Sequence, residues 1–148
     1  MDTSMAQQFS TTFGDYELSS DPARLDLDRV ESFLRASYWA AERPREVIER
    51  SIAGSLCMGA YRRSDGLQVG FSRLVTDYAT FGWLCDVFVD PDARGQKLGV
   101  AMVEALVTLP EVRNLNLVLQ TADAHKLYER FGFAPLWNPD RWLYKPRS

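Results

Sequence analysis

The spacing of apolar residues changes along this chain, and these changes limit the folds that it can adopt. Between residues 27 and 54, apolar side chains recur every three or four positions, which predicts two helices. Pro44 marks the start of the second helix, since proline is favoured at the first helical position. Strand-like runs bounded by turn residues follow at 56–61, 67–75 and 81–89. We expect these three strands to form an antiparallel meander.

The C-terminal half alternates between helix and strand, which predicts an α/β fold with a mixed sheet. A long apolar helix covers about residues 96–109, and Gly132 fits the end of a shorter helix that reaches Arg130. Four further segments have a strand pattern: 16–19, 115–120, 133–136 and 142–145. We expect helices on the faces of the sheet, in one domain over residues 14–148 that follows a loose polar tail over residues 1–13.

Composition argues against several classes of protein. The net charge of -3 does not suit a nucleic-acid binder that relies on bulk positive charge. No apolar run is long enough to span a membrane and the N-terminus lacks a signal-peptide pattern, so we expect a cytoplasmic protein without a membrane partner. Cys57 and Cys85 lie in apolar strands, which fits free thiols in a reducing compartment. The single histidine cannot build a multi-histidine metal site, and we expect no metal.

The segment from Val87 to Val100 carries the strongest functional signal. A strand leads through an Asp-Pro turn into the start of a helix, where the first backbone amides have no partner within the helix and attract anions. Glycines there let a phosphate approach the backbone, and Arg94 and Lys97 add positive charge. The spacing matches neither a P-loop nor a dinucleotide fingerprint. From the glycine spacing alone, a plain turn with solvated charges is an equal alternative.

Two motifs then point to a family. Residues 87–99 read Val-x-Val-x-Pro-x-x-Arg-Gly-x-x-Leu-Gly, which resembles the acetyl-CoA signature of the GCN5-related N-acetyltransferases. Residues 124–133 resemble the closing helix of that family, with its tyrosine and its Gly-Phe pair. The resemblance implies a mixed, mostly antiparallel sheet that splays open between its fourth strand, 81–89, and its fifth, 115–120, with helices on both faces. It also implies that acetyl-CoA lies in this gap.

The same resemblance implies how the co-substrate is held. Backbone groups of Val87, Phe88 and Val89 would bind the pantetheine arm as an added strand. The residues around the pyrophosphate would be Arg94, Gly95, Gln96, Lys97, Leu98, Gly99 and Val100. The family usually has glycine at position 97, and we expect Lys97 to be tolerated there because a helical conformation does not require glycine. Thr121 lies near a position where many members carry asparagine, and its hydroxyl is a further candidate contact.

The family mechanism is direct transfer of the acetyl group to an amine in a ternary complex. The backbone amide near Val89 would face the carbonyl oxygen, and Tyr128 matches the acid that protonates the departing sulfur. Spacing alone would instead place Tyr128 in the core. Asp86 interrupts an apolar strand, and we interpret it as a group that binds or deprotonates the ammonium, or as a residue paired to an arginine. His125 as base and Cys85 as nucleophile are weaker alternatives.

The acceptor amine cannot be identified from these motifs. We expect Tyr38, Trp39 and Tyr78 to line its pocket together with Asp86, with Trp137 and Trp142 as further candidates. The partner would be a small-molecule amine or a protein amino group, and the oligomeric state is open, with a homodimer as one option. The sequence thus predicts an acetyl-CoA-dependent N-acetyltransferase. The alternatives are a catalytically idle acyl-CoA-binding or sensor domain, or an interaction domain that has lost the co-substrate.

Overall fold

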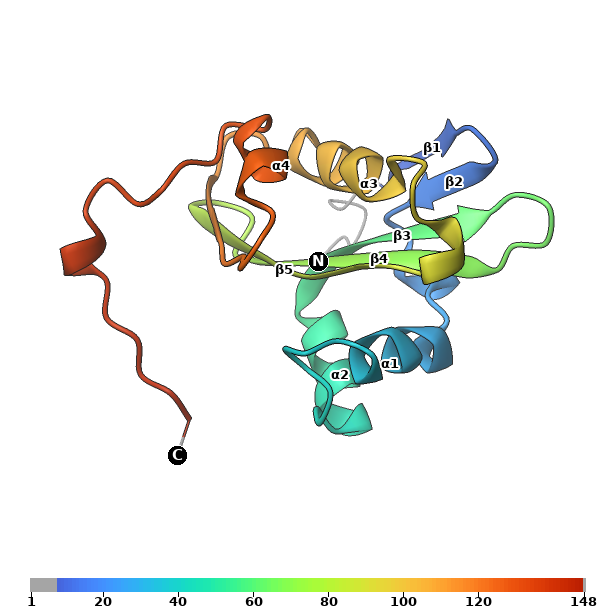
Figure 1. Ribbon diagram of the computed structural model, residues 1–148, viewed down its shortest axis with the longest axis horizontal. Coiled ribbons are helices and arrows are strands. Elements are labelled where there is room, and N and C mark those ends of the chain that lie inside the picture. The colour runs from blue at the N-terminus through green and yellow to red at the C-terminus, as the bar shows by residue number, and fades with distance from the viewer. Residues whose placement is uncertain (1–7, 148) are drawn as a thin grey trace, which may run out of the picture.

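The computed structural model describes residues 8–147 and contains one six-stranded sheet (Figure 1). The strands lie side by side in chain order: β1 (Ser10–Phe13), β2 (Tyr16–Ser19), β3 (Ser55–Arg62), β4 (Gln68–Thr76), β5 (Phe81–Val89) and β6 (Asn116–Leu119). All neighbours pair antiparallel except β5 and β6, which are parallel. The α-helices are α1 (Leu27–Arg35), α2 (Arg45–Ala53), α3 (Leu98–Val107) and α4 (His125–Glu129).

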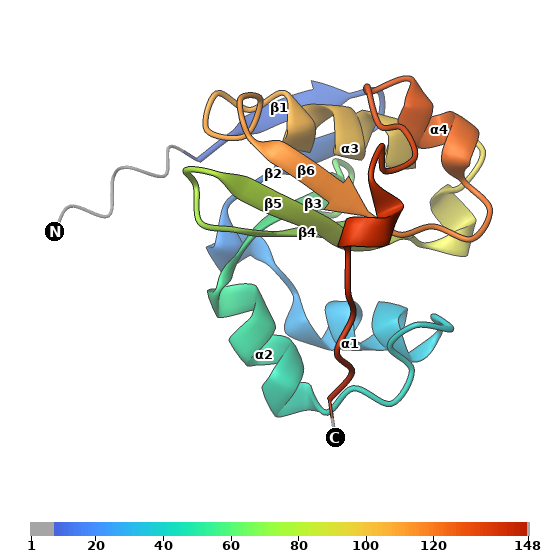
Figure 2. The ribbon, with the colours of Figure 1, turned by 90° about the vertical axis from the view of Figure 1, so that its left-hand side faces the viewer.

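Helices cover both faces of the sheet, as predicted. Figures 1 and 2 show α1 and α2 on one face and α3 and α4 on the other. The two faces have separate cores, because side chains alternate between the faces of each strand. Val30, Phe33 and Leu34 of α1 pack with Phe71 and Phe88 on the first face. On the second face the apolar side of α3 packs against residues of β3, β4 and β5.

The pairing of β5 and β6 stops halfway along β5. Partners run from Phe81 with Asn116 to Leu84 with Leu119, after which β5 continues to Val89 paired with β4 but, among residues 8–147, with no strand on its other side. The register between β4 and β5 also shifts at this point, and Asp86 takes a positive φ of 54°. A bulge of this kind bends a strand and re-aims its side chains. The sheet is therefore open between β5 and β6, which confirms the predicted splay. These are the fifth and sixth strands rather than the fourth and fifth, because β1 precedes the strand at 16–19 that we expected to be the first.

Three expectations differ from the structure. Residues 10–13, assigned to the loose tail, pair with β2; residues 1–7 lie outside the described part of the chain. The long helix begins at Leu98 rather than near residue 96. Segments 133–136 and 142–145 are not strands, because no strand of the same chain pairs with them among residues 8–147 and Pro139 starts a short 3-10 helix, η4 (Pro139–Arg141), between them. No helix within residues 8–147 is long and apolar enough to cross a membrane.

Candidate active site

The gap between β5 and β6 opens into a cavity of about 950 Å³. Its wall comes from the segment after α1, from β5, and from the turn between β6 and α4. The predicted site residues that it brings together are Tyr38, Trp39, Asp86, Val87, Phe88, Val89, Arg94, Thr121 and Tyr128. Residues distant in sequence thus meet where β5 and β6 separate.

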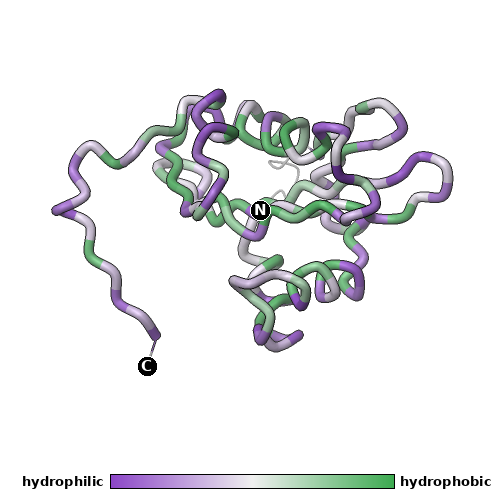
Figure 3. The backbone as a smooth tube through the Cα atoms, in the orientation of Figure 1, coloured by the Kyte–Doolittle hydropathy of each residue, from purple (hydrophilic) through white to green (hydrophobic). Residues whose placement is uncertain are grey.

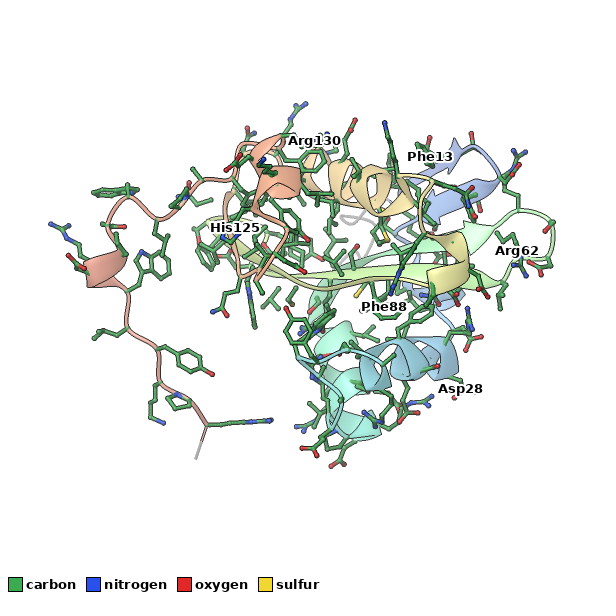
Figure 4. All side chains as sticks on the ribbon, in the orientation of Figure 1. Phe13, Asp28, Arg62, Phe88, His125 and Arg130 are labelled. Atoms are coloured by element: carbon green, nitrogen blue, oxygen red, sulfur yellow. The ribbon has the colours of Figure 1, made fainter. Side chains whose placement is uncertain are left out.

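Backbone rather than side-chain groups face the cavity along the open part of β5. The Phe88 ring stacks on Phe33 with ring centres 4.9 Å apart and is buried against α1 (Figure 4). Val87 and Val89 pack against the other core. Among residues 8–147, the edge of β5 beyond Leu84 has no strand partner on the β6 side, so an extended ligand can bind there as an added strand. In this structure Arg94 Nε donates to the Val89 carbonyl at 2.9 Å.

The turn after β5 presents free amides at the start of α3. The Asp90 carboxylate accepts from the Asp92 amide at 2.9 Å and from Arg29 of α1 at 2.7 Å, which fixes the short 3-10 helix η3 (Pro91–Ala93). Within residues 8–147, no backbone amide from Gly95 to Val100 donates to a protein acceptor. Gly95 has a φ of 85° and is exposed. Unpaired amides at a helix start suit a pyrophosphate, and the site fits the co-substrate that the motif implies.

Lys97 corrects one expectation. Its φ is 61°, so it adopts the left-handed rather than the right-handed helical conformation that we predicted. This conformation is unfavourable for residues with a Cβ atom and favours glycine. The preference of the family for glycine here therefore follows from backbone geometry. Leu98 differs from its neighbours because the residue is buried, so its side chain belongs to the core rather than to a ligand site.

Asp86 lies at the centre of a buried ion-pair cluster. Its Oδ2 accepts from Arg73 Nε at 2.9 Å and from Arg43 at 2.7 Å, while Oδ1 accepts from Trp39 Nε1 at 3.1 Å. The Asp86 and Arg73 side chains are only 2% and 8% exposed. The cluster joins β4, β5 and the segment after α1, and it fixes the Trp39 ring at the cavity wall.

This environment decides between the two interpretations of Asp86. Burial alone would raise the pKa of the Asp86 carboxyl, but the hydrogen bonds and charges of Arg43 and Arg73 outweigh burial and hold the pKa below its usual value. A carboxylate held as an anion by two guanidinium groups is a poor proton acceptor. The structure contains the arginine-paired alternative, in which the Asp86 carboxylate holds Arg43 and the Trp39 ring at the cavity wall.

Tyr128 lies on the wall of the cavity. It lies on α4, is partly buried against the core, and lines the cavity. Burial raises its pKa, so the phenol keeps its proton at neutral pH. Thr121 also lines the cavity, but its Oγ1 accepts from the Ala124 amide at 3.1 Å and caps the turn before α4. Burial raises the pKa of the Cys85 thiol to about 11, which disfavours a nucleophilic role.

The structure does not place every predicted residue in this cavity. Tyr78 is in the turn between β4 and β5, at the opposite end of β5 from Val89, and does not line the cavity, so its assignment to the acceptor pocket is corrected. Exposed His125 begins α4 and lines a second cavity instead (Figure 4). Sequence reasoning missed Arg43 and Arg73. A signal existed for Arg73, because an arginine within one apolar strand and an aspartate within the next predict a buried pair.

Comparisons with known proteins agree with this geometry. The family model described as an acetyltransferase (GNAT) domain matches residues 36–135. A Gibberella zeae protein whose name describes it as an acetyltransferase is 31% identical over 143 residues, covering 82% of this chain and 80% of the relative.

Solved structures with a similar fold are also described as acetyltransferases. A Xanthomonas campestris protein described as a GNAT-family acetyltransferase is 36% identical, with a TM-score of 0.85 over 89% of this chain and 93% of its own. A Clostridium acetobutylicum protein described as an acetyltransferase with acetyl-CoA shares the fold, with a TM-score of 0.62 at 16% identity over 88% and 94% of the two chains. The family model alone spans more than half of the sequence. The chain therefore belongs to the GCN5-related N-acetyltransferase (GNAT) family.

Proposed function

We propose that this protein transfers the acetyl group of acetyl-CoA directly to a primary amine in a ternary complex. The observation that carries the proposal is the separation of β5 from β6 after Leu84, which opens a cavity that both the free edge of β5 and the Tyr128 side chain line. Acetyl-CoA supplies the reactive thioester when it is bound. The Clostridium acetobutylicum neighbour described with acetyl-CoA has the same fold, which supports this choice of donor.

The residues of this chain would hold the donor in two stretches. The backbone of Val87, Phe88 and Val89, which among the described residues has no strand partner on the β6 side, would pair with the amide-rich pantetheine arm, and this adds hydrogen bonds without requiring specific side chains. The free amides from Gly95 to Val100 and the positive end of α3 would hold the pyrophosphate. Arg94, which binds the Val89 carbonyl in the free protein, would lie between the two stretches.

Tyr128 would donate its phenolic proton to the sulfur as the thiolate leaves. The phenol is a candidate for this role because it carries its proton at neutral pH and lines the same cavity as the β6-facing edge of β5. General acid catalysis by a positioned side chain contributes roughly 10²–10⁴-fold to rate. The backbone amide near Val89 would stabilise negative charge that develops on the carbonyl oxygen. Most of the remaining acceleration would come from holding the two substrates together.

The acceptor end of the cavity is aromatic. Tyr38, Trp39 and Trp83 line it with exposed ring surface. Asp86 lies nearby, but Arg43 and Arg73 neutralise its charge, so it offers no free anion to a cationic acceptor. Aromatic faces bind aliphatic stems and also attract ammonium groups. These features support a small-molecule amine or a protein amino group carried on an aliphatic stem.

A thiol-release assay with acetyl-CoA tests the proposal. The panel contains polyamines, amino acids, aminoglycosides and peptides with free N-termini, and we expect turnover with one of these classes. On that substrate, Tyr128→Phe should lower kcat by about 10² while acetyl-CoA affinity and the circular dichroism spectrum stay unchanged. Tyr78→Phe is the matched control, since Tyr78 lies outside the cavity, and it should leave kcat unaltered. Full activity of Tyr128→Phe on a verified substrate would contradict the role of the phenol.

One observation favours a second candidate, an idle acyl-CoA-binding domain. The buried carboxylate at the acceptor end, Asp86, is held by two arginines and cannot readily accept a proton. Saturable binding of acetyl-CoA without thiol release for any amine in the panel would favour this candidate. A ligand that binds only the native state raises the melting temperature once its concentration exceeds Kd. Calorimetry with acetyl-CoA therefore distinguishes a protein that binds it without turnover from one that has lost both binding and turnover.

A further inference from the structure

The ion-pair cluster behind the cavity carries one more positive charge than negative. Figure 3 shows mainly hydrophobic residues along β5, and Asp86 is the charged residue that interrupts them. Its side chain and that of Arg73 on β4 are 2% and 8% exposed and pair at 2.9 Å. This pair is complete by itself, because one guanidinium balances one carboxylate. Arg43, which also donates to Asp86, therefore brings a positive charge that no anion of the cluster balances.

The Arg43 guanidinium keeps donors for a ligand. Its Nη1 donates to Asp86, and among residues 8–147 its Nε and Nη2 donate to no protein acceptor. These two nitrogens lie along one edge of the planar group, and such an edge matches the two oxygens of a carboxylate. Arg43 lines the cavity and its side chain is 21% exposed. Arg73 does not line the cavity, and it donates from Nε to Asp86 and from Nη1 to Ser55. Arg43 is thus the arginine of the cluster that a ligand can reach.

The segment after α1 fixes the backbone of Arg43 although this segment contains no helix or strand. Arg35 of α1 donates from Nη1 to the Arg43 carbonyl at 2.6 Å, and the Arg43 amide donates to the Ala40 carbonyl at 3.1 Å. Ser37 Oγ donates to the Leu34 carbonyl at 2.7 Å and accepts from the Ala40 amide at 3.1 Å. Because Asp86 also holds the guanidinium, a ligand that binds it has little ordering cost to overcome.

The other charged residues at the cavity wall leave this positive charge in place. Arg94, in the stretch that would hold the donor, adds to it. Asp123 lies in the turn before α4 and is exposed, so solvent and salt screen its charge. An acceptor with only positive charges would be repelled by Arg43, whereas one that also carries a carboxylate would be attracted.

We propose that Arg43 binds a carboxylate of the acceptor, which makes small amino acids the preferred substrates, because they carry an amine and a carboxylate in one molecule. This inference rests on the proposed acetyl transfer, since it names the acceptor of that reaction. The carboxylate would accept from Nε and Nη2 while Nη1 stays on Asp86, and the amine would lie in the cavity that Tyr128 also lines. Polyamines and aminoglycosides, which lack an anionic group, would be poor substrates.

Pairs of amino acids and their carboxamides test this specificity. Each carboxamide has nearly the shape of its acid but lacks the negative charge, and α- and ω-amino acids together cover several separations of amine and carboxylate. Thiol release at saturating acetyl-CoA gives KM, and calorimetric titration into protein saturated with coenzyme A gives Kd without turnover. We expect KM and Kd of the best acid to be roughly tenfold to a hundredfold lower than those of its carboxamide, because a charge-assisted contact is lost.

Arg43→Gln assigns this preference to one residue. Asp86 keeps Arg73 as its partner in this variant, so we expect the circular dichroism spectrum to be unchanged. KM of the acid should rise roughly tenfold to a hundredfold, while kcat and the KM of the carboxamide stay nearly unaltered. Arg43→Lys keeps the charge but lacks the two-donor edge and should recover only part of the preference. Arg50→Gln removes an exposed arginine of α2 outside the cavity, and this matched control should change neither KM.

The results distinguish this inference from the proposed function. Acids that bind more tightly than their carboxamides but are never acetylated would support the carboxylate site and contradict acetyl transfer. Acetylation of acids and carboxamides with equal KM by the wild type, or an equal rise of both KM values in Arg43→Gln, would overturn the carboxylate site and leave acetyl transfer intact. The wild-type comparison decides the matter by itself if Arg43→Gln does not fold.

Discussion

Asp86→Asn is the substitution that tests the ion-pair cluster behind the cavity. Asparagine keeps the size of the side chain and tolerates the positive φ of 54° at this position, so the change removes charge with little effect on the backbone. It leaves Arg73, which is 7% exposed, without its anion. Breaking a buried pair by removing one partner costs about 3–5 kcal/mol. We expect a value near 3 kcal/mol, because the asparagine oxygen still accepts a hydrogen bond and Arg43 is partly solvated.

Urea unfolding at pH 7 measures this loss of stability as a lower urea concentration at the midpoint of unfolding. The exposed acid Asp92 is the matched control, and Asp92→Asn should change stability by less than about 0.5 kcal/mol. Adding Arg73→Met to Asp86→Asn should recover part of the loss, because the second change removes the unpaired buried charge. A cost below about 0.5 kcal/mol for Asp86→Asn would refute the account of a buried, fully engaged carboxylate.

The pH dependence of the free energy of unfolding gives an independent test of the lowered pKa of Asp86. The folded-state pKa of Asp86 is lowered relative to the unfolded chain, so its contribution to stability is present above the unfolded value of about 3.9. That contribution is lost as pH falls through the folded pKa. The difference in stability between the wild type and Asp86→Asn should therefore be constant from pH 7 to about 5 and shrink at lower pH. A difference that grows on acidification would contradict the direction of the shift.

Two further substitutions test the backbone and the core. Lys97→Gly should stabilise the protein by about 0.5–1 kcal/mol in urea unfolding, because relief of the left-handed conformation exceeds the entropy cost of glycine. Lys97→Ala should give no such gain, and equal effects of the two changes would contradict the assigned conformation. Tyr61→Phe should raise the melting temperature slightly, because among the described residues the buried Tyr61 hydroxyl has no hydrogen-bond partner and leaving it buried costs roughly 1 kcal/mol or more. A loss of stability would mean that the hydroxyl has a partner.

Local sequence pattern predicted most of this fold because most of its elements are locally determined. The periodicity of 27–54 and the turn residues between 61 and 81 indicate helices and a meander whatever surrounds them. Segment 142–145 has an equally good strand pattern but is not a strand here, because a strand exists only when another pairs with it. Strand pairing is therefore the property that pattern alone could not supply.

The candidate site also divides into residues that local sequence predicts and residues whose role depends on distant parts of the chain. The stretch from Val87 to Val100 could be located from sequence because one local signal, a strand that enters a glycine-bearing helix start, marks it. The role of Asp86 could not, because it depends on Arg43, which comes from the segment after α1 and lies 43 residues away in sequence. The left-handed conformation of Lys97 could not be predicted either. Lysine by itself favours the right-handed helical region, and only the turn before α3 imposes the left-handed one.

The central claim is acetyl transfer at the open edge between β5 and β6, and one measurement tests it most directly. The protein is incubated with acetyl-CoA that carries a deuterated acetyl group and with the amine panel, and the products are identified by mass spectrometry. We expect the label on the nitrogen of one amine class, formed much more slowly by Tyr128→Phe and at the normal rate by Tyr78→Phe. No labelled amine from a folded protein that binds acetyl-CoA, or equal labelling by wild type and Tyr128→Phe, would contradict the account.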